Sequence, residues 1–307
     1  MTRGWDGRRA LVTGAGSGVG REIARALAAG GAHVLMPVRD RGRGEAAMNS
    51  IRETVPDASL ELCDLDLADF ASVSALGRRL REDAEPIELY VMNAGIILLG
   101  DAQRHETVDG HELHFQTNFL GHVLLTRELC PLLQAGAARI AVQLSLASAV
   151  GSLKDLESTR RYSAVRAYAA SKRAFGLYGV ELARRAAAGA WGVQVNLCHP
   201  GVAPDTGIAG DLRRQRAARH GASDGKAGLA RRLGGTPAEA AQPALAALAA
   251  DAPDGRFFAP GGRLGLSGPP RERKLFRALR DEVGARRMWD LAEELIGAEP
   301  ERTPDLL

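Results

Sequence analysis

The chain has 307 residues, of which 45% are hydrophobic and 25% charged, and its formal net charge is +3. These values are typical of an ordinary globular protein with a sizeable core, and the small net charge gives no indication of a nucleic-acid partner. No run of about 18 apolar residues occurs, so the sequence predicts no membrane-spanning helix.

The cysteines and the N-terminus indicate a compartment. Cys63, Cys130 and Cys198 form no C-x-x-C pair and lie in apolar contexts, so we expect reduced thiols in the core. Residues 1–7 contain no apolar leader segment. We therefore expect a cytoplasmic protein without a membrane anchor.

Strand and helix patterns alternate along the chain. The predicted strands are residues 10–13, 33–38, 59–63, 87–93, 138–144, 193–198 and 256–259. The predicted helices are residues 19–29, a helix that Asp40 caps, and residues 70–83, 106–133, 164–188 and 237–250. This alternation predicts a doubly wound α/β fold: a seven-stranded parallel sheet with helices on both faces and ligands at the C-terminal strand ends.

We expect a single domain over residues 1–307, with two additions. Residues 203–235 are rich in arginine and alanine and lack an apolar period, which predicts a lid. We interpret the arginines of this lid as a solvent-exposed face. The alternative interpretation is that they bind an acidic ligand or partner. Residues 268–298 have apolar side chains at helical spacing, which predicts a helical extension.

A glycine-rich turn follows the first strand. The run from Thr13 to Gly20 fits the pattern T-G-x-x-x-G-x-G, and it fits neither G-x-G-x-x-G nor the P-loop. Glycine permits φ > 0 and a close approach of the backbone, and the start of the next helix offers free N–H groups. The turn is therefore predicted to hold a pyrophosphate.

Tyr168 and Lys172 stand four residues apart in a predicted helix, which puts both side chains on one face. An isolated tyrosine has a pKa of about 10. A cation about 4 Å away favours the phenolate by roughly 4 kcal/mol at an effective dielectric constant of ~20, while desolvation opposes this effect. The spacing predicts a tyrosine whose pKa is lowered enough to exchange a proton near neutrality.

The sequence has three further features. Asn93-Ala94-Gly95 comes after a mid-chain strand, Ser145 lies at a strand end before Tyr168, and a later strand runs into Pro200-Gly201. Together the motifs resemble the short-chain dehydrogenase/reductase family over about residues 8–262. Residues 155–168, with His199 before Pro200, resemble its retinol-dehydrogenase-like branch and the soluble bacterial relatives of that branch. The resemblance implies a Rossmann fold and an oxidoreductase that acts on C=O and CH–OH groups.

The resemblance implies a catalytic set of Asn118, Ser145, Tyr168 and Lys172. Tyr168 would exchange a proton with the substrate oxygen, and Ser145 would form a hydrogen bond to the same oxygen. Lys172 would lower the pKa of Tyr168 and bind the nicotinamide ribose, and Asn118 would hold a water that connects Lys172 to solvent. Ser148 is the alternative to Ser145, and residues 154–165 are expected to form a substrate-side loop.

The resemblance also implies where a dinucleotide binds. The pyrophosphate would contact the glycine turn, and the adenine would contact the end of the third strand. The adenosine ribose would lie against Asn93-Ala94-Gly95. The nicotinamide would contact Tyr168 and Lys172 and the Pro200-Gly201 turn. The implied cofactor residues are Gly14, Ser17, Gly18, Val19, Arg39, Asp64, Leu65, Asn93, Ala94, Gly95, Tyr168, Lys172, Pro200, Gly201 and Val202. Thr206 lies one residue later than the family's nicotinamide-binding threonine, so a contact through the backbone of Val202 is preferred.

The end of the second strand favours one cofactor. NAD sites usually place an acid there to bind the ribose 2′-hydroxyl. Here that position is Val38, and Arg39 follows it. Because arginine binds a 2′-phosphate through forked hydrogen bonds, the sequence favours NADP(H) over NAD(H).

The sequence gives little indication of a metal site. His111 and His114 have no evident third ligand, so we interpret them as part of a surface helix and predict no metal. The prediction is an NADP(H)-dependent ketoreductase or alcohol dehydrogenase for an apolar small molecule, with no nucleic-acid or membrane partner. A non-catalytic NADP-binding regulator on the same fold and a methyltransferase are the alternatives. Members of the family usually form dimers or tetramers, so the resemblance implies a homodimer or homotetramer.

Overall fold

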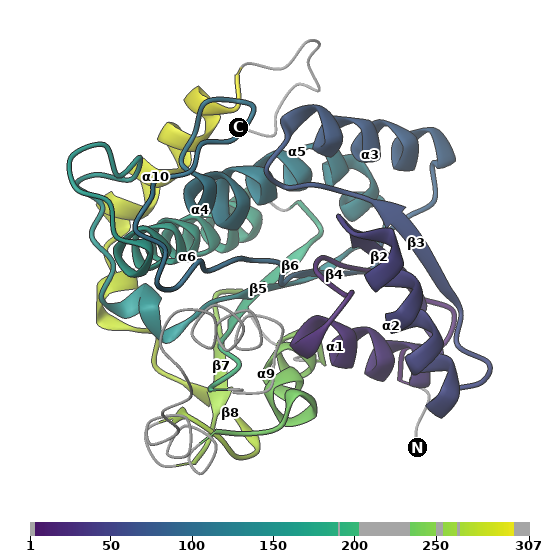
Figure 1. Ribbon diagram of the computed structural model, residues 1–307. Helices are drawn as coiled ribbons and strands as arrows, with labels where there is room; N and C mark the ends of the chain where they lie inside the picture. Colours follow the sequence, from purple (N-terminus) through teal and green to yellow (C-terminus); the bar gives the residue numbers. More distant parts are fainter. Residues whose placement is uncertain (1–3, 190, 203–233, 250–253, 263–264, 298–307) are drawn as a thin grey trace, which may run out of the picture.

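The computed structural model describes residues 4–189, 191–202, 234–249, 254–262 and 265–297. Its strands form one sheet in the order β3-β2-β1-β4-β5-β6-β7-β8 (Figure 1). The strands are β1 Arg9–Val12, β2 His33–Val38, β3 Leu60–Asp64, β4 Leu89–Met92, β5 Arg139–Gln143, β6 Gln194–Cys198, β7 Phe257–Pro260 and β8 Pro270–Arg273. The seven predicted strands are all present, and they pair in parallel.

The predicted count of seven strands was one too low. The eighth strand, β8, pairs antiparallel with β7 at the edge of the sheet. Its sequence is Pro-Arg-Glu-Arg, and its residues are half-buried or exposed. It therefore has no apolar alternation from which a strand could be predicted.

Helices cover both faces of the sheet (Figure 1). One face carries α3, α5, α6 and α10, and the other carries α1, α2 and α9. The helices are α1 Gly18–Ala29, α2 Arg41–Thr54, α3 Phe70–Asp83, α4 Leu113–Phe115, α5 Gly121–Ala135, α6 Ala164–Gly189, α9 Pro237–Ala249 and α10 Glu282–Leu295, with the π-helix η1 Gln116–Leu120 and the 3-10 helices η2 Leu146–Ala149 and η4 Arg277–Leu279. Because both faces are covered, strands such as β1 and β4 are buried along their whole length.

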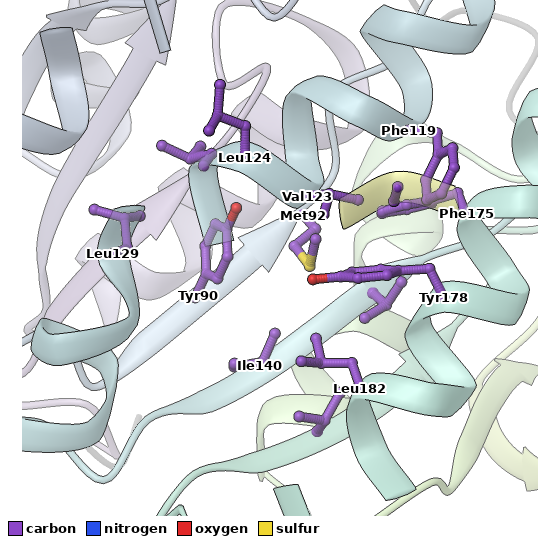
Figure 2. Close-up of a cluster of buried hydrophobic side chains, with 14 of the residues drawn as sticks. Tyr90, Met92, Phe119, Val123, Leu124, Leu129, Ile140, Phe175, Tyr178 and Leu182 are labelled. Carbon is purple, nitrogen blue, oxygen red and sulfur yellow. The ribbon is translucent and has the colours of Figure 1, made fainter. Parts of the chain in front are cut away.

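The core beneath α6 holds that helix in place. Figure 2 shows Phe175, Tyr178 and Leu182 of α6 among buried side chains that include Tyr90 of β4. The Tyr178 ring also stacks on Trp289 of α10, with ring centroids 5.0 Å apart. Because the predicted catalytic tyrosine and lysine lie on α6, this packing fixes their position relative to the sheet.

The sheet has its topological switch point at β1. The chain runs from β1 to β2 and β3 on one side and then crosses to β4 on the other side of β1. Ligands of such sheets bind in the crevice beyond the C-terminal ends of the strands that flank this point. The glycine turn after β1 and residues 93–95 after β4 therefore border the same crevice.

The helix predicted for residues 106–133 begins only at Leu113. The preceding segment forms a turn, which an antiparallel bridge between Glu106 and Glu112 closes. The surface-helix interpretation of the two histidines was therefore wrong. His114 is fully buried, and its Nδ1 lies 2.7 Å from the Glu112 carboxylate.

The helical extension predicted for residues 268–298 also begins later than expected. Its first part contains β8 and η4, and the helix α10 starts at Glu282. The Asp281 side chain caps α10 by accepting a hydrogen bond from the Gly284 amide at 2.9 Å. This cap defines the start of the helix.

Asp40 caps α2 as predicted, since its carboxylate accepts a hydrogen bond from the Arg43 amide at 3.0 Å. The predicted lid of residues 203–235 lies outside the described residues except for its last two positions, and Thr206 lies outside them too. Within the described part of the chain, no helix combines the length and the apolar character that a membrane span requires.

Candidate active site

The glycine turn has the geometry of an anion cradle. Gly14 and Gly18 adopt φ values of +69° and +54°, which favour glycine. A Cβ on Gly20 would overlap the Gly14 carbonyl and lie 2.5 Å from Nδ2 of Asn93. Ser17 precedes α1 without capping it through its side chain, and the first turn of α1 contains no acid. The N–H groups of this helix start can thus face a pyrophosphate.

Asn93 and Ala94 are tied to the glycine turn through Thr13. The Thr13 hydroxyl accepts hydrogen bonds from the amides of Asn93 and Ala94 at 2.9 and 3.0 Å. The Asn93 side chain donates to the Thr13 carbonyl at 2.7 Å. These bonds bring together the ends of β1 and β4, where the sequence predicted a shared cofactor wall.

Gly95 separates two of the predicted catalytic residues. A Cβ on Gly95 would lie 3.1 Å from Oδ1 of Asn118 and 3.2 Å from Nζ of Lys172. A larger residue would have to displace one of these polar atoms. The glycine of the Asn-Ala-Gly run therefore leaves room for the amide and the ammonium.

Asn118 lies in the π-helix η1 between α4 and α5. Its side chain is fully buried and clamps Ile96: Oδ1 accepts from the Ile96 amide at 2.7 Å, and Nδ2 donates to the Ile96 carbonyl at 3.0 Å. Nδ2 also donates to the Ser171 hydroxyl at 3.0 Å. Single π-turns within helices frequently occur at functional sites.

Ser145 begins the turn η2 shortly after β5, and it is half-buried. Its hydroxyl accepts a hydrogen bond from the Ala147 amide at 3.2 Å, and its own amide donates to the Ser148 hydroxyl at 3.3 Å. Ser148 is fully buried, and its hydroxyl is directed at the backbone of α6. Of the two candidate serines, Ser145 is the one whose side chain affects the pKa of Tyr168.

Burial raises the pKa of Tyr168, and the nearby Ser145 side chain lowers it by a smaller amount. The pKa of Tyr168 therefore lies above its ordinary value. The predicted lowering of this pKa by Lys172 was wrong for the protein alone. The four-residue spacing suggested an ammonium beside the phenol, whereas the ammonium is directed at the end of β5.

Lys172 is 4% exposed, and its Nζ donates a long hydrogen bond of 3.4 Å to the Gln143 carbonyl. Nζ also lies 5.1 Å from the centre of the Phe175 ring. Burial lowers the pKa of Lys172 to about 8. An ammonium has three donors, so one long bond leaves capacity for a ligand hydroxyl at this edge.

The turn after β6 contains Pro200, Gly201 and Val202. Gly201 has φ +79°, and a Cβ there would overlap the Leu266 carbonyl. The Val202 amide donates to that carbonyl at 2.9 Å, and the Val202 carbonyl accepts from the Gly235 amide at 2.8 Å. Both backbone groups of Val202 are thus engaged, which weakens the case for the predicted nicotinamide contact at this residue.

Arg39 lies exposed at the end of β2, directly after the buried Val38. Val38 is close to the glycine turn, since its Cγ1 would lie 3.4 Å from a Cβ on Gly16. Leu65 is buried after β3, and its amide donates to the Val38 carbonyl at 3.0 Å. The structure therefore places Arg39 beside the turn that was predicted to hold the pyrophosphate.

The acids near Arg39 are occupied by other arginines. Arg41 binds the Asp64 carboxylate through two hydrogen bonds of 3.2 and 3.1 Å. The Arg43 guanidinium lies 3.4 Å from the Asp40 carboxylate. Arg39 is thus the arginine of this group that has no acidic partner among the described residues. Asp64, which was predicted at the adenine edge, is exposed and paired.

The segment predicted as a substrate-side loop, residues 154–165, is attached through Glu157. Its carboxylate accepts from the Glu112 amide at 2.7 Å and lies 2.8 Å from Nδ1 of His111. Its backbone carbonyl accepts from Nε of Arg104 at 2.7 Å. The segment is therefore held against the turn that precedes α4.

Sequence reasoning missed Gln143, which lies between two predicted site residues. Its side-chain amide donates to Oδ1 of Asn93, and its backbone carbonyl accepts from Lys172. A polar glutamine at the end of an otherwise apolar strand was the available signal for this residue.

Two further supporting residues were also missed. Nε2 of His122 lies 3.0 Å from the Ala94 carbonyl, and the Ser171 hydroxyl accepts from the Asn118 side chain. Neither belongs to a motif, so the sequence carried no signal for them. Among the residues described, no group of three or more His, Cys, Asp or Glu side chains is arranged to bind a metal.

The sequence profile of the short chain dehydrogenases matches residues 8–217. Human retinol dehydrogenase 13 is 32% identical over 307 residues, which cover 95% of this chain and 86% of that protein. Mouse polyprenol dehydrogenase is 39% identical over 203 residues, which cover 64% of this chain and 60% of that protein. The match to that relative thus spans less than two thirds of its length.

Two solved structures share the fold. An uncharacterized protein from Mycobacterium paratuberculosis is 31% identical, with a TM-score of 0.75 over 97% of this chain and 98% of that chain. The 3-oxoacyl (acyl-carrier-protein) reductase from Agrobacterium tumefaciens C58, with NADP bound, is 26% identical. Its TM-score is 0.62 over 83% of this chain and 94% of that chain.

Proposed function

The chain belongs to the short-chain dehydrogenase family and its retinol-dehydrogenase-like branch, and from this premise we propose an NADP(H)-dependent oxidoreductase. The proposed enzyme reduces a ketone or aldehyde of an apolar small molecule, or oxidises the matching alcohol. We assign the catalytic roles to Asn118, Ser145, Tyr168 and Lys172.

The observation that carries this proposal is the proximity of the Ser145 and Tyr168 side chains, since Ser145 lowers the pKa of Tyr168. Two hydroxyls, one at the start of η2 and one on α6, converge there at the edge of the sheet where the glycine turn and Gly95 also lie. One hydroxyl can transfer a proton to a substrate oxygen while the other donates a hydrogen bond to it. A packing role alone does not require both hydroxyls at this edge.

A nicotinamide dinucleotide fits the residues that border the crevice. Gly14 and Gly18 of the cradle have positive φ, and Gly20 packs against the Gly14 carbonyl, so the backbone before the start of α1 has a conformation suited to a pyrophosphate. Nζ of Lys172 has donors left for a ribose hydroxyl. NADP bound to the related Agrobacterium reductase supports the same class of cofactor.

The choice of NADP(H) over NAD(H) depends on Arg39. This arginine is exposed beside the cradle and has no acidic partner in the described part of the chain, while the position before it is the apolar Val38. A 2′-phosphate can therefore accept forked hydrogen bonds from its guanidinium without repulsion from an acid at position 38.

When bound, the cofactor supplies or accepts the hydride. Burial raises the pKa of Tyr168 and keeps the phenol protonated near neutral pH, which suits a residue that donates a proton to the oxygen of a carbonyl. Ser145 holds that oxygen through its hydroxyl. Lys172 binds the ribose through the donors of its ammonium group that the Gln143 carbonyl leaves unused. Asn118 fixes the backbone before η1 and, through Ser171, the neighbouring turn of α6.

Exposed apolar residues that follow Ser145 or precede Tyr168 in the chain support an apolar substrate. Leu146 follows Ser145 and is 36% exposed, Val150 after η2 is 78% exposed, and Val165 at the start of α6 is 55% exposed. Retinol and polyprenol dehydrogenases are among the relatives, which supports the same class of substrate.

To test the proposal, the purified protein is incubated with NADPH and a panel of apolar ketones and aldehydes, and the loss of NADPH absorbance is followed. We expect turnover in the wild type, and we expect Tyr168→Phe to bind NADPH without turnover. NADPH binding without any turnover in the wild type would favour a regulator instead. An absence of NADPH and NADH binding would contradict both.

Three predictions from the sequence remain predictions. They are the single-domain organisation, the cytoplasmic location and the homodimer or homotetramer.

A further inference from the structure

A pocket with a volume of about 280 Å³ lies near the ends of β6 and β7. Phe257, Ala259 and the half-buried Phe276 provide apolar walls, and Leu146 borders it next to Ser145. Ser145 and Tyr168 are not among the described residues that line it. The pocket is therefore a neighbour of the proposed reaction centre and not a part of it.

His199 is a buried polar group in the wall of this pocket. It is 2% exposed, and neither ring nitrogen has a hydrogen-bond partner among the described residues. Its ring lies 6.0 Å from the Phe276 ring, between centroids. Burial lowers the pKa of His199 to about 4, so the imidazole is neutral at pH 7 with one donor and one acceptor.

A buried polar group without a hydrogen-bond partner lowers the stability of the fold, and most buried polar atoms in proteins have such a partner. Because His199 borders a cavity, a ligand oxygen can supply the missing partner. A neutral imidazole matches an uncharged oxygen, such as a hydroxyl or a carbonyl, better than it matches an anion.

The rim of the pocket carries positive charge. Arg273 and Lys274 line it and are exposed, and none of the described lining residues is acidic. The Arg273 guanidinium donates one long hydrogen bond of 3.4 Å to the Pro260 carbonyl. Lys274 has no acidic partner within the described part of the chain. In contrast, Arg256 on the same sheet edge is paired with Glu272.

We propose that this pocket binds a small apolar carboxylic acid that also bears a hydroxyl or carbonyl oxygen. The apolar body lies against Phe257 and Phe276, the uncharged oxygen bonds to His199, and the carboxylate meets Arg273 and Lys274. The volume equals that of roughly nine liquid waters, which limits the ligand to about the size of a phenyl ring with a short chain.

Binding is measured by calorimetry on the full chain without a nicotinamide, so that the result does not depend on the proposed reaction. The probes are 4-oxo-4-phenylbutyrate, 4-phenylbutyrate, which lacks the ketone oxygen, and 4-phenylbutan-1-ol, which lacks the carboxylate. We expect the oxo acid to bind most tightly. Arg273→Ala and Lys274→Ala should each weaken both acids by about threefold to fivefold, and leave the alcohol unchanged.

Arg271→Ala is the matched control, because Arg271 is an exposed arginine on the same strand that does not line the pocket. It should leave all three affinities essentially unchanged. Equal binding of the three probes, binding of none of them, or a loss in Arg271→Ala equal to that in Arg273→Ala would each overturn the proposal.

The role of His199 has its own readout. His199→Phe should abolish the advantage of the oxo acid over 4-phenylbutyrate. Since this variant can fail to fold, the same contact is followed in the wild type through the nitrogen-15 signals of the His199 ring. The oxo acid should shift these signals more than 4-phenylbutyrate does, and identical shifts would exclude the proposed contact.

Discussion

The Ser148 hydroxyl donates a 2.9 Å hydrogen bond to the backbone carbonyl of Lys172. It also accepts from the Ser145 amide, so one buried side chain joins the turn η2 to the helix α6. The two proposed catalytic hydroxyls lie on these two elements. Their relative position therefore depends on a serine whose own hydroxyl is directed at the helix backbone.

Ser148→Ala should separate this positioning role from catalysis. Loss of two buried hydrogen bonds should lower the free energy of unfolding by about 1–3 kcal/mol and reduce kcat by roughly tenfold. Ser145→Ala should instead reduce kcat by about a hundredfold or more with a smaller loss of stability. Chemical denaturation and steady-state kinetics of both variants provide the comparison, and the reverse ranking of kcat would identify Ser148 as the catalytic serine.

Tyr168→Phe should abolish most of the reductase activity. The phenol is the proposed proton donor, and general acid catalysis contributes about 10²–10⁴ in rate. The dissociation constant for NADPH, measured by fluorescence, should stay nearly constant, because the ring itself is retained. A variant with full turnover would remove Tyr168 from its proposed role.

The lowered pKa of Lys172 predicts how the stability of the cofactor-free protein depends on pH. Its pKa is lowered from 10.5 to about 8 in the folded protein by burial. Between these values the unfolded chain binds the proton and the folded protein does not, so this group makes stability rise with pH. The free energy of unfolding of the wild type relative to Lys172→Met should increase by up to about 3 kcal/mol over this window. Lys274→Met replaces an exposed lysine and leaves Lys172 in place, so its free energy of unfolding should rise with pH as in the wild type when both are measured by denaturant titration.

Arg39→Ala tests the preference for the phosphorylated cofactor. Charge-assisted hydrogen bonds contribute about 1.5–3 kcal/mol, so the KM for NADPH should rise by roughly tenfold or more. The KM for NADH should stay nearly constant, since the adenosine ribose of NADH carries no 2′-phosphate. Arg52→Ala, at an exposed arginine near the other end of α2, is the control. Equal losses for both cofactors would contradict the assignment.

Gly20→Ala should weaken NADPH and NADH alike. The added Cβ would meet the Gly14 carbonyl and Asn93, so the cradle must shift and the fold should lose about 1–3 kcal/mol. Gly42→Ala is the matched substitution, because its Cβ would meet only Oδ1 of Asp40 at 3.5 Å. It should keep cofactor affinity and gain up to about 1 kcal/mol from helix propensity. Isothermal titration with each cofactor and denaturant titration measure the two effects.

Much of the fold could be predicted from local patterns. The central parallel strands are largely apolar, as strands covered on both faces must be, and they alternate with amphipathic helices. The glycine turn was predictable from the sequence because the structure requires glycine there. Gly14 has a positive φ, and a side chain at Gly20 would overlap neighbouring atoms. The placement of Ser145 beside Tyr168 followed from the resemblance and not from spacing alone.

The remaining features depend on tertiary contacts that local patterns do not encode. The turn before Leu113 is stabilised by Glu157, which binds the Glu112 amide and His111. Asn118 clamps Ile96, a residue from another segment, and no local pattern predicts a π-turn there. The pKa of Tyr168 depends on how deeply α6 is buried, and a four-residue spacing contains no information on burial.

The antiparallel strand β8 has a consequence for how molecules of this protein can associate. A sheet that ended at β7 would present Phe257, Phe258 and Ala259 at an open edge, which is a template for pairing with another chain. β8 covers that edge with Arg271, Glu272 and Arg273 and begins with a proline. Charged side chains on a four-residue border strand discourage the growth of a continuous sheet from one molecule into the next, and this protects the apolar strand behind them from aggregation.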